Sequence, residues 1–118
     1  MKALTLHQPW ASLIAGGIKK EETRGWYCSF RGPLAIHAGK YVDLEACDFF
    51  HLRPELIARG VVLCTVEMVD CVESAFYPNK NEYGNFEAGR FVFVFENLKV
   101  LTPAVPAKGN RLLWEWIL

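Results

Sequence analysis

The densest group of side chains that could do chemistry lies between Gly17 and Trp26. Five charged residues follow Ile18 within six positions: Lys19, Lys20, Glu21, Glu22 and Arg24. If the segment is extended, Lys20, Glu22 and Arg24 share one face, and Lys19, Glu21 and Thr23 share the other. If its first turn is helical, Lys19 and Glu22 form an i, i+3 pair. Either conformation places a lysine beside a carboxylate.

Lys19 and Glu22 are the two candidate catalytic residues of this segment. A lysine is a nucleophile only in its neutral form, and a nearby carboxylate favours the charged form. Only burial would lower the lysine pKa far enough for such chemistry. The alternative is a charged turn without a chemical role, because runs of charged residues are usually solvated. Residue types and spacing leave both interpretations open.

The common catalytic and cofactor motifs are absent from the sequence. It contains no GxxxxGK[ST] phosphate loop, no G-x-S-x-G, no H-E-x-x-H and no EF-hand loop. The three histidines stand far apart, at positions 7, 37 and 51, so no ligand spacing supports a metal site. We therefore expect no metal and no cofactor.

Further polar and aromatic side chains are candidates for binding a ligand. Trp26 directly follows the charged segment, and His37 stands at the end of an expected strand. Lys40 follows a glycine, where it could meet a phosphate group. Tyr83 and Arg90 flank a polar loop and could form the wall of a lid. For each of these residues, a purely structural role is the alternative.

The apolar pattern predicts short strands and short helices. Strands are expected at residues 3–6, 33–38, 61–69, 91–96 and 98–102, the last ended by Pro103. One helix is expected over residues 9–16, with Trp10 on its apolar face, and a second begins after Asp43. Residues 61–69 and 91–96 are apolar at nearly every position, which predicts that both faces of these strands are covered. The polar stretch 77–90 is expected to be a loop.

These elements predict an α+β fold. The strands do not alternate regularly with helices, which argues against a doubly wound parallel sheet. We expect a small, mostly antiparallel β-barrel decorated by two or three short helices. A chain of 118 residues is expected to form a single domain, residues 1–118.

The charges are balanced over the whole chain but not along it. Thirteen basic and 13 acidic residues give a net charge of zero, which excludes a strongly basic nucleic-acid binder. The first 40 residues hold six basic and two acidic side chains, which predicts a face that attracts anions.

The cysteines and the apolar runs indicate the compartment. The cysteines at positions 28, 47, 64 and 71 include no Cys-x-x-Cys pair. Neither a signal peptide nor an apolar run of membrane-spanning length is visible. We expect a cytoplasmic protein with reduced thiols and no membrane partner.

Three blocks of the sequence resemble the activating-signal-cointegrator homology (ASCH) domain family. The first is Gly17-x-Lys19-x-x-Glu22-x-Arg24, preceded by Gln8-Pro9-Trp10-Ala11 and followed by Trp26. The second is RGPLAIHAGK at residues 31–40, and the third is GRFVFVF at residues 89–95, followed by Trp114. These blocks span nearly the whole chain, and the last two are similar to those of small stand-alone bacterial members.

The resemblance implies a fold and a ligand class. ASCH domains belong to the pseudouridine-synthase-and-archaeosine-transglycosylase (PUA)-like superfamily of small β-barrels, whose members bind RNA or modified bases. In the family, the Gly-x-Lys-x-x-Glu-x-Arg motif borders a cleft, and a basic cleft with aromatic walls suits a base and a phosphate. The implied function is binding of RNA or a modified nucleotide. The candidate site residues are Lys19, Glu22, Arg24, Trp26, His37, Lys40, Tyr83 and Arg90.

The resemblance leaves other functions open. Some small ASCH-like proteins are amidohydrolases of N4-acetylcytidine that use the lysine of this motif, and others are described as ribonucleases. Lys19 matches that lysine, whereas Glu22 stands where the amidohydrolases have a threonine, and Thr23 is expected to face another way. The glutamate of their later loop corresponds to Glu82 or Glu87. Eukaryotic members occur in transcriptional coactivators, so a protein-interaction module is a further interpretation.

Overall fold

The computed structural model of the protein describes residues 1–117. Within these residues, six strands, two α-helices and two short 3-10 helices follow one another. In order they are β1 (Lys2–Gln8), α1 (Trp10–Ala15), β2 (Glu21–Arg24), β3 (Gly32–Val42), α2 (Leu44–Phe49), η1 (Pro54–Leu56), β4 (Val61–Glu73), η2 (Ser74–Phe76), β5 (Phe91–Pro106) and β6 (Leu113–Glu115).

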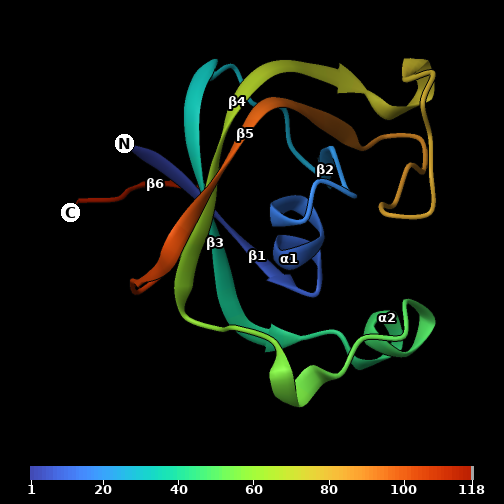
Figure 1. Ribbon diagram of the computed structural model, residues 1–118. Coiled ribbons are helices and arrows are strands. Elements are labelled where there is room, and N and C mark those ends of the chain that lie inside the picture. Colours follow the sequence, from blue (N-terminus) through green and yellow to red (C-terminus); the bar gives the residue numbers. More distant parts are fainter. Residues whose placement is uncertain (118) are drawn as a thin grey trace.

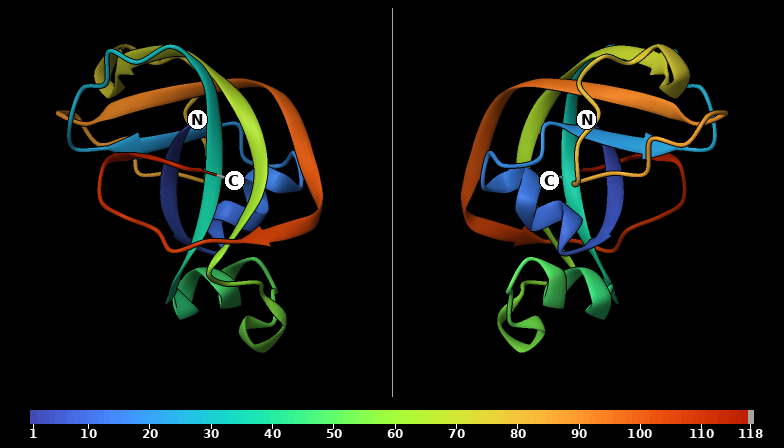
Figure 2. Two further views of the ribbon diagram at one scale, coloured as in Figure 1. Left: turned by 90° about the vertical axis from the view of Figure 1, so that its left-hand side faces the viewer. Right: turned by 90° about the vertical axis from the view of Figure 1, so that its right-hand side faces the viewer.

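The strands form one sheet in the order β2-β5-β4-β3-β1-β6. β1 and β3 run parallel, and the other neighbouring strands are antiparallel. The sheet curls around α1, as the side views also show (Figures 1 and 2). Between residues 1 and 117 no strand pairing joins β2 to β6, so the hydrogen-bonded ladder is open. The α+β class with a mostly antiparallel sheet is confirmed, whereas closure into a barrel stays a prediction.

β5 differs from the two strands that the sequence predicts for this part of the chain. Residues 91–96 and 98–102 belong to one long strand, β5, which passes through Asn97 at a φ of 54°. Asparagine adopts this left-handed conformation more readily than most residues. Pro103 does not end the strand, because it lies between the paired positions Val100 and Val105, where the register shifts and the ladder requires no N–H from it.

From Cys64 onward β4 has one buried face and one face toward solvent, so the prediction that both faces are covered is wrong for this part of residues 61–69. The buried side chains alternate along this part: Cys64, Val66 and Met68. Val62 lies beyond a shift of register and is buried in a second cluster with Ala3, Ala35 and Trp116. Glu67 and Val69 lie on the other face and are exposed. An antiparallel sheet commonly packs one face on the core and leaves the other face to water. Apolar residues such as Val69 can lie on the water-facing side, so an apolar run alone does not show that both faces are covered.

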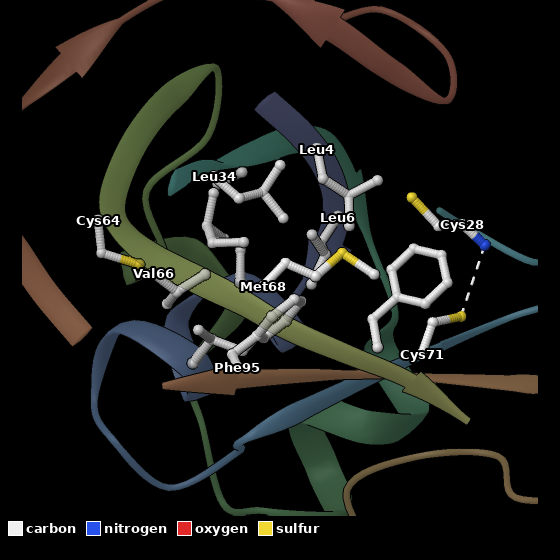
Figure 3. Close-up of a cluster of buried hydrophobic side chains, with 14 residues drawn as sticks. Leu4, Leu6, Cys28, Leu34, Cys64, Val66, Met68, Cys71 and Phe95 are labelled. Atoms are coloured by element: carbon white, nitrogen blue, oxygen red, sulfur yellow. Dashed lines mark hydrogen bonds between the residues drawn. The ribbon is translucent and has the colours of Figure 1, made fainter. Parts of the chain in front are cut away.

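The core lies between α1 and the concave face of the sheet. Side chains from β1, β3, β4 and β5 meet there, including Leu4, Leu34 and Phe95 (Figure 3). Cys28 and Cys71 adjoin this cluster, and the Cys28 backbone N–H donates to Cys71 Sγ at 3.5 Å (Figure 3). All four cysteines are buried free thiols, and burial raises the pKa of the Cys64 thiol to about 12.

Two segments outside the sheet frame the site described next. α2 lies apart from the sheet, at the turn between β3 and β4 (Figure 1), and the Asp43 side chain caps it by accepting from the Ala46 N–H at 3.0 Å. Residues 77–90 contain neither helix nor strand, as predicted.

α1 ends as predicted at its glycines, with Gly17 at a φ of 76°. No helix within residues 1–117 has the length and apolar character needed to cross a bilayer.

Candidate functional site

A pocket of about 450 Å³ opens between α1, β2 and the loop 77–90. We call it the Lys19 pocket. It is lined by His7, Trp10, Lys19, Glu22, Thr23, Arg24, Glu82, Tyr83, Gly84, Asn85 and Arg90. Three of these residues carry positive charge and two are carboxylates. The pocket therefore combines the charged segment of the sequence with a loop much later in the chain.

Lys19 is almost completely buried, with 3% of its surface exposed. Its Nζ donates to the backbone carbonyl of Tyr83 at 2.5 Å and lies 3.4 Å from Oε1 of Glu22. The same nitrogen lies 5.4 Å from the centre of the Trp10 ring, within the range of a cation–π contact. The ammonium group is thus held by groups from the loop, from β2 and from α1.

Burial lowers the pKa of Lys19 from its ordinary value of 10.5. The neighbouring Glu22 carboxylate raises this pKa, but its effect is smaller than that of burial. Removal from water disfavours the charged amine, whereas a nearby negative charge favours it. The net direction is the one that nucleophilic or base chemistry by a lysine requires.

Glu22 lies between two cations. Its Oε2 is 3.2 Å from Arg24 Nη2, while its Oε1 faces Lys19. Arg24 Nη2 also donates to the Thr5 carbonyl at 2.8 Å. Among the described residues, the buried Nε of Arg24 has no hydrogen-bond partner. Glu22 and Arg24 share one face of β2, which confirms the pairing predicted for an extended segment.

Arg90 joins β2 to the loop on another wall of the pocket. Its Nη2 donates to the Thr23 carbonyl at 3.0 Å, and its Nε donates to the Asn85 carbonyl at 3.1 Å. Thr23 is buried and alternates along β2 with Glu22 and Arg24, as expected, and it is nevertheless part of the pocket wall. The loop covers this threonine, which brings it to the pocket despite its place in the strand alternation.

Glu21, another buried residue of β2, anchors the loop. Its Oε2 accepts from the Tyr77 hydroxyl at 2.5 Å, and its Oε1 accepts from Asn81 Nδ2 at 3.1 Å. Burial and the carboxylate together raise the pKa of Tyr77 to about 12. Asn81 Oδ1 in turn accepts from the Tyr83 N–H at 2.9 Å. Glu21 therefore fixes the loop residue whose carbonyl receives Lys19.

A row of aromatic rings runs from α1 to the loop. The Tyr83 ring stacks on Phe50 with 5.2 Å between centroids, and Phe50 meets Trp10 edge-on at 5.8 Å. Trp10 packs against the core, as predicted, and also lines the pocket. The segment that follows α2 thus supports both the helix and the loop that shape the site.

The structure brings five of the eight predicted site residues together in the Lys19 pocket: Lys19, Glu22, Arg24, Tyr83 and Arg90. Trp26 is not among the residues that line it, and its ring packs edge-on against Phe93 at 5.1 Å beside the core. His37 and Lys40 line a separate hollow of about 930 Å³. The single cleft expected from the sequence is therefore divided into two parts.

His37 supports that second hollow from below its surface, with 2% of its area exposed. Its Nε2 lies 2.7 Å from the Ala107 carbonyl, which can only accept, so Nε2 carries the proton. Its Nδ1 lies 3.1 Å from the Thr5 hydroxyl oxygen, to which Trp114 Nε1 donates at 3.0 Å. Both ring nitrogens of His37 therefore already have partners.

Sequence reasoning missed several pocket residues. His7 and Asn85 carried no motif, although Asn85 lies in the polar loop that the sequence did single out. Of the two loop glutamates, Glu82 lines the pocket, whereas Glu87 is not part of its wall. Among residues 1–117, no three His, Cys, Asp or Glu side chains gather in a way that could hold a metal ion.

Comparisons with known proteins find related sequences. The family model described as the ASCH domain matches residues 4–103. Activating signal cointegrator 1 of Mus musculus is 33% identical over 126 residues, which cover 95% of this chain and 22% of the mouse protein. The Homo sapiens protein of the same name is 32% identical over the same shares of the two chains. The chain thus spans less than a quarter of the length of these relatives.

Proposed function

Because the chain belongs to the ASCH domain family, we propose that its Lys19 pocket binds one nucleotide, either within RNA or as a free modified nucleotide. The observation that carries this proposal is the composition of the pocket. Within about 450 Å³, Lys19, Arg24 and Arg90 stand against two carboxylates and beside an aromatic wall. Pockets of a few hundred Å³ with a few convergent polar groups are typical of small-molecule sites.

The two arginines are suited to the phosphate. Arg24 and Arg90 are each held by backbone carbonyls of neighbouring strands and loops, so their guanidinium groups are positioned before a ligand arrives. Each guanidinium has five N–H donors, and only part of them are used by these contacts. Charge-assisted contacts of arginine with phosphate are among the stronger hydrogen bonds in proteins.

The loop and β2 are suited to the base and the ribose. Glu22 and Glu82 offer carboxylate oxygens, and Asn85 offers an amide, in the same pocket. Exocyclic amines and ribose hydroxyls donate hydrogen bonds, so carboxylates are natural partners for them. Single-stranded RNA is recognised mainly through such contacts to unstacked bases, together with aromatic stacking.

The proposal is tested by titrating the protein with nucleoside monophosphates and with short single-stranded RNA. We expect Arg24→Ala and Arg90→Ala each to weaken binding at least about 10-fold, since each removes a charged hydrogen-bond donor. Arg111→Ala is the matched control, because Arg111 is exposed and lines neither hollow. If folding is verified by circular dichroism and Arg24→Ala and Arg90→Ala bind as tightly as the wild type and Arg111→Ala, the proposal is contradicted.

A second candidate function is favoured by the surroundings of Lys19. Lys19 is buried with a lowered pKa, and Glu82 lies in the same pocket. We propose as the alternative that the protein hydrolyses the acetyl amide of an N4-acetylcytidine-like nucleoside, with water adding across the bond to give cytidine and acetate. Lys19 would act as nucleophile or base, and Glu22 as its proton partner.

This alternative is tested by following the release of cytidine from N4-acetylcytidine by chromatography. Hydrolysis by the wild type that is lost in Lys19→Ala and kept in Lys99→Ala supports the enzyme. Lys99 is the control because it is exposed and lines neither hollow. No release by folded wild-type protein would remove this activity, and the nucleotide-binding proposal would then stand or fall on the titrations above.

A further inference from the structure

The hollow beside His37 is positively charged in a protein of zero net charge. Lys40 and Lys108 line it, and no aspartate or glutamate is among its lining residues. Both lysines are exposed, and among residues 1–117 neither forms an ion pair with a carboxylate. We call this feature the Lys40–Lys108 hollow. Its charge is less compensated than that of the Lys19 pocket.

A loop of fixed shape forms one wall of the Lys40–Lys108 hollow. The backbone amides of Lys108, Gly109 and Asn110 have no hydrogen-bond acceptor in the described part of the chain. A Cβ on Gly109 would lie 2.5 Å from Thr5 Oγ1 and 2.7 Å from His37 Nδ1, so only glycine fits this approach. Lysines next to unpaired backbone amides are a combination that binds phosphate oxygens.

The floor of the hollow is held by a series of hydrogen bonds. Hydrogen bonds link Trp114 to Thr5, Thr5 to His37, and His37 to the carbonyl of Ala107. Ala107 is the first residue of the loop 107–110. Ala107 also donates its N–H to the Gly60 carbonyl at 3.0 Å. The loop is therefore held from two sides, and the hollow has its shape without a ligand.

The hollow and the Lys19 pocket meet at β1. The Thr5 carbonyl accepts from Arg24 of the pocket, while Thr5 also lines the hollow. Two positions further along β1, His7 lines the pocket, and its ring lies 4.5 Å from that of Tyr41, which follows Lys40. Tyr41 is 61% exposed and His7 is exposed as well. The two rings are inclined at 55° to each other, so a base between the two sites could stack on one of them.

We propose that the Lys40–Lys108 hollow binds the phosphodiester backbone of a single-stranded RNA whose neighbouring nucleotide occupies the Lys19 pocket, with one of the His7 and Tyr41 rings stacking on a base between them. This inference rests on the proposed function. It names single-stranded RNA of several nucleotides, rather than a free nucleotide, as the ligand class. It also assigns separate roles to the two halves of the site.

The test compares a nucleoside monophosphate with single-stranded RNAs of two, four and six nucleotides, by calorimetry or fluorescence anisotropy. We expect wild-type affinity to rise at least about 10-fold from the monophosphate to the tetranucleotide, since added phosphate contacts strengthen binding. Lys40→Ala/Lys108→Ala should lose most of this increase and leave monophosphate binding unchanged. Lys20→Ala/Lys99→Ala removes the same charge from exposed lysines that line neither site, and should match the wild type.

The outcomes separate this inference from the proposed function. If the monophosphate binds and the tetranucleotide binds equally well to the wild type and to Lys40→Ala/Lys108→Ala, the hollow has no role and the pocket stands. If RNA binding depends on the two lysines but is unchanged in Arg24→Ala and Arg90→Ala, the hollow binds RNA without the pocket and the pocket proposal fails. If both double variants weaken RNA binding equally, the effect is one of overall charge, and the inference is overturned.

Discussion

At the scale of single residues, the site depends on contacts between residues far apart in the sequence. Lys19 donates to the carbonyl of Tyr83, Tyr83 is fixed through Asn81, and Asn81 is held by Glu21. Glu21 also accepts from Tyr77. The position of the pocket lysine is therefore coupled to a buried carboxylate that does not line the pocket.

Tyr77→Phe tests this coupling. The variant leaves Glu21 with one donor fewer, and we expect the free energy of unfolding to fall by about 1–3 kcal/mol at pH 7. Folding raises the pKa of Tyr77 from 10.0 to about 12, so the stability it contributes is complete below pH 10 and is lost as the pH rises through 12. The difference between wild type and Tyr77→Phe should therefore shrink across this window. Urea unfolding at pH 8, 10 and 11 measures it.

Tyr27→Phe is the control for this experiment. Tyr27 is 56% exposed, and its ring contact with Phe91 is kept by phenylalanine. We expect its unfolding free energy to match the wild type within about 0.5 kcal/mol, as for most surface changes. Indistinguishable stability of the two variants at every pH would show that the Tyr77 contact with Glu21 contributes nothing.

The sequence predicts part of this site well. Lys19, Glu22 and Arg24 lie within one short segment, so strand alternation and i, i+3 spacing suffice to place them near one another. The contacts of Glu21 and Arg90 could not be predicted, because each of them joins β2 to the loop 77–90. The course of that loop is set by side-chain hydrogen bonds, which leave no periodic pattern in the sequence.

At the scale of elements, the local apolar pattern predicts where the strands lie. Their lengths and their exposed faces depend on the curvature of the sheet. The separate expected strands 91–96 and 98–102 merge, because β5 bends through Asn97 and pairs with β4 across shifts of register. Such irregularities allow a sheet to curl. The sequence shows the apolar residues of a strand, but neither its bends nor the side left to water.

Gly109→Ala tests the loop that carries the Lys40–Lys108 hollow. The added methyl group would overlap Thr5 and His37, and we expect the unfolding free energy to fall by about 1–3 kcal/mol. Gly25→Ala is the matched control, since a Cβ there meets no atom within 4 Å. Denaturant unfolding of both variants decides the point, and equal stability would mean that the loop moves aside without cost.

At the scale of the whole molecule, the charge is neutral but unevenly distributed over the surface. Five of the 13 basic residues line the Lys19 pocket or the Lys40–Lys108 hollow: Lys19, Lys40, Arg24, Arg90 and Lys108. The Lys19 pocket and the Lys40–Lys108 hollow meet at β1, so the cations of both can act on one extended ligand. The six basic residues near the N-terminus predicted an anion-attracting face, but not its division into two sites.

Salt dependence measures this arrangement as a whole. For single-stranded RNA, log affinity should fall with log salt by a slope of about −0.7 for each phosphate neutralised. For a tetranucleotide we expect a slope of log affinity against log salt of about −2, and a shallower slope for Lys40→Ala/Lys108→Ala. Anisotropy titrations over a salt series provide the slopes. A slope near zero for the wild type would exclude phosphate contacts as the source of affinity.

The place of Glu22 between Lys19 and Arg24 has a consequence for selectivity. An anion that enters the pocket meets cations that already have a resident counterion, so its binding is an exchange and not a simple addition. Inorganic anions that offer only charge gain little from such an exchange, because they replace one ion pair by another. A ligand that also supplies donors to the displaced carboxylate, as a base or a ribose does, satisfies both sides. If the pocket binds a nucleotide as proposed, we expect Glu22 to make it discriminate against bare phosphate.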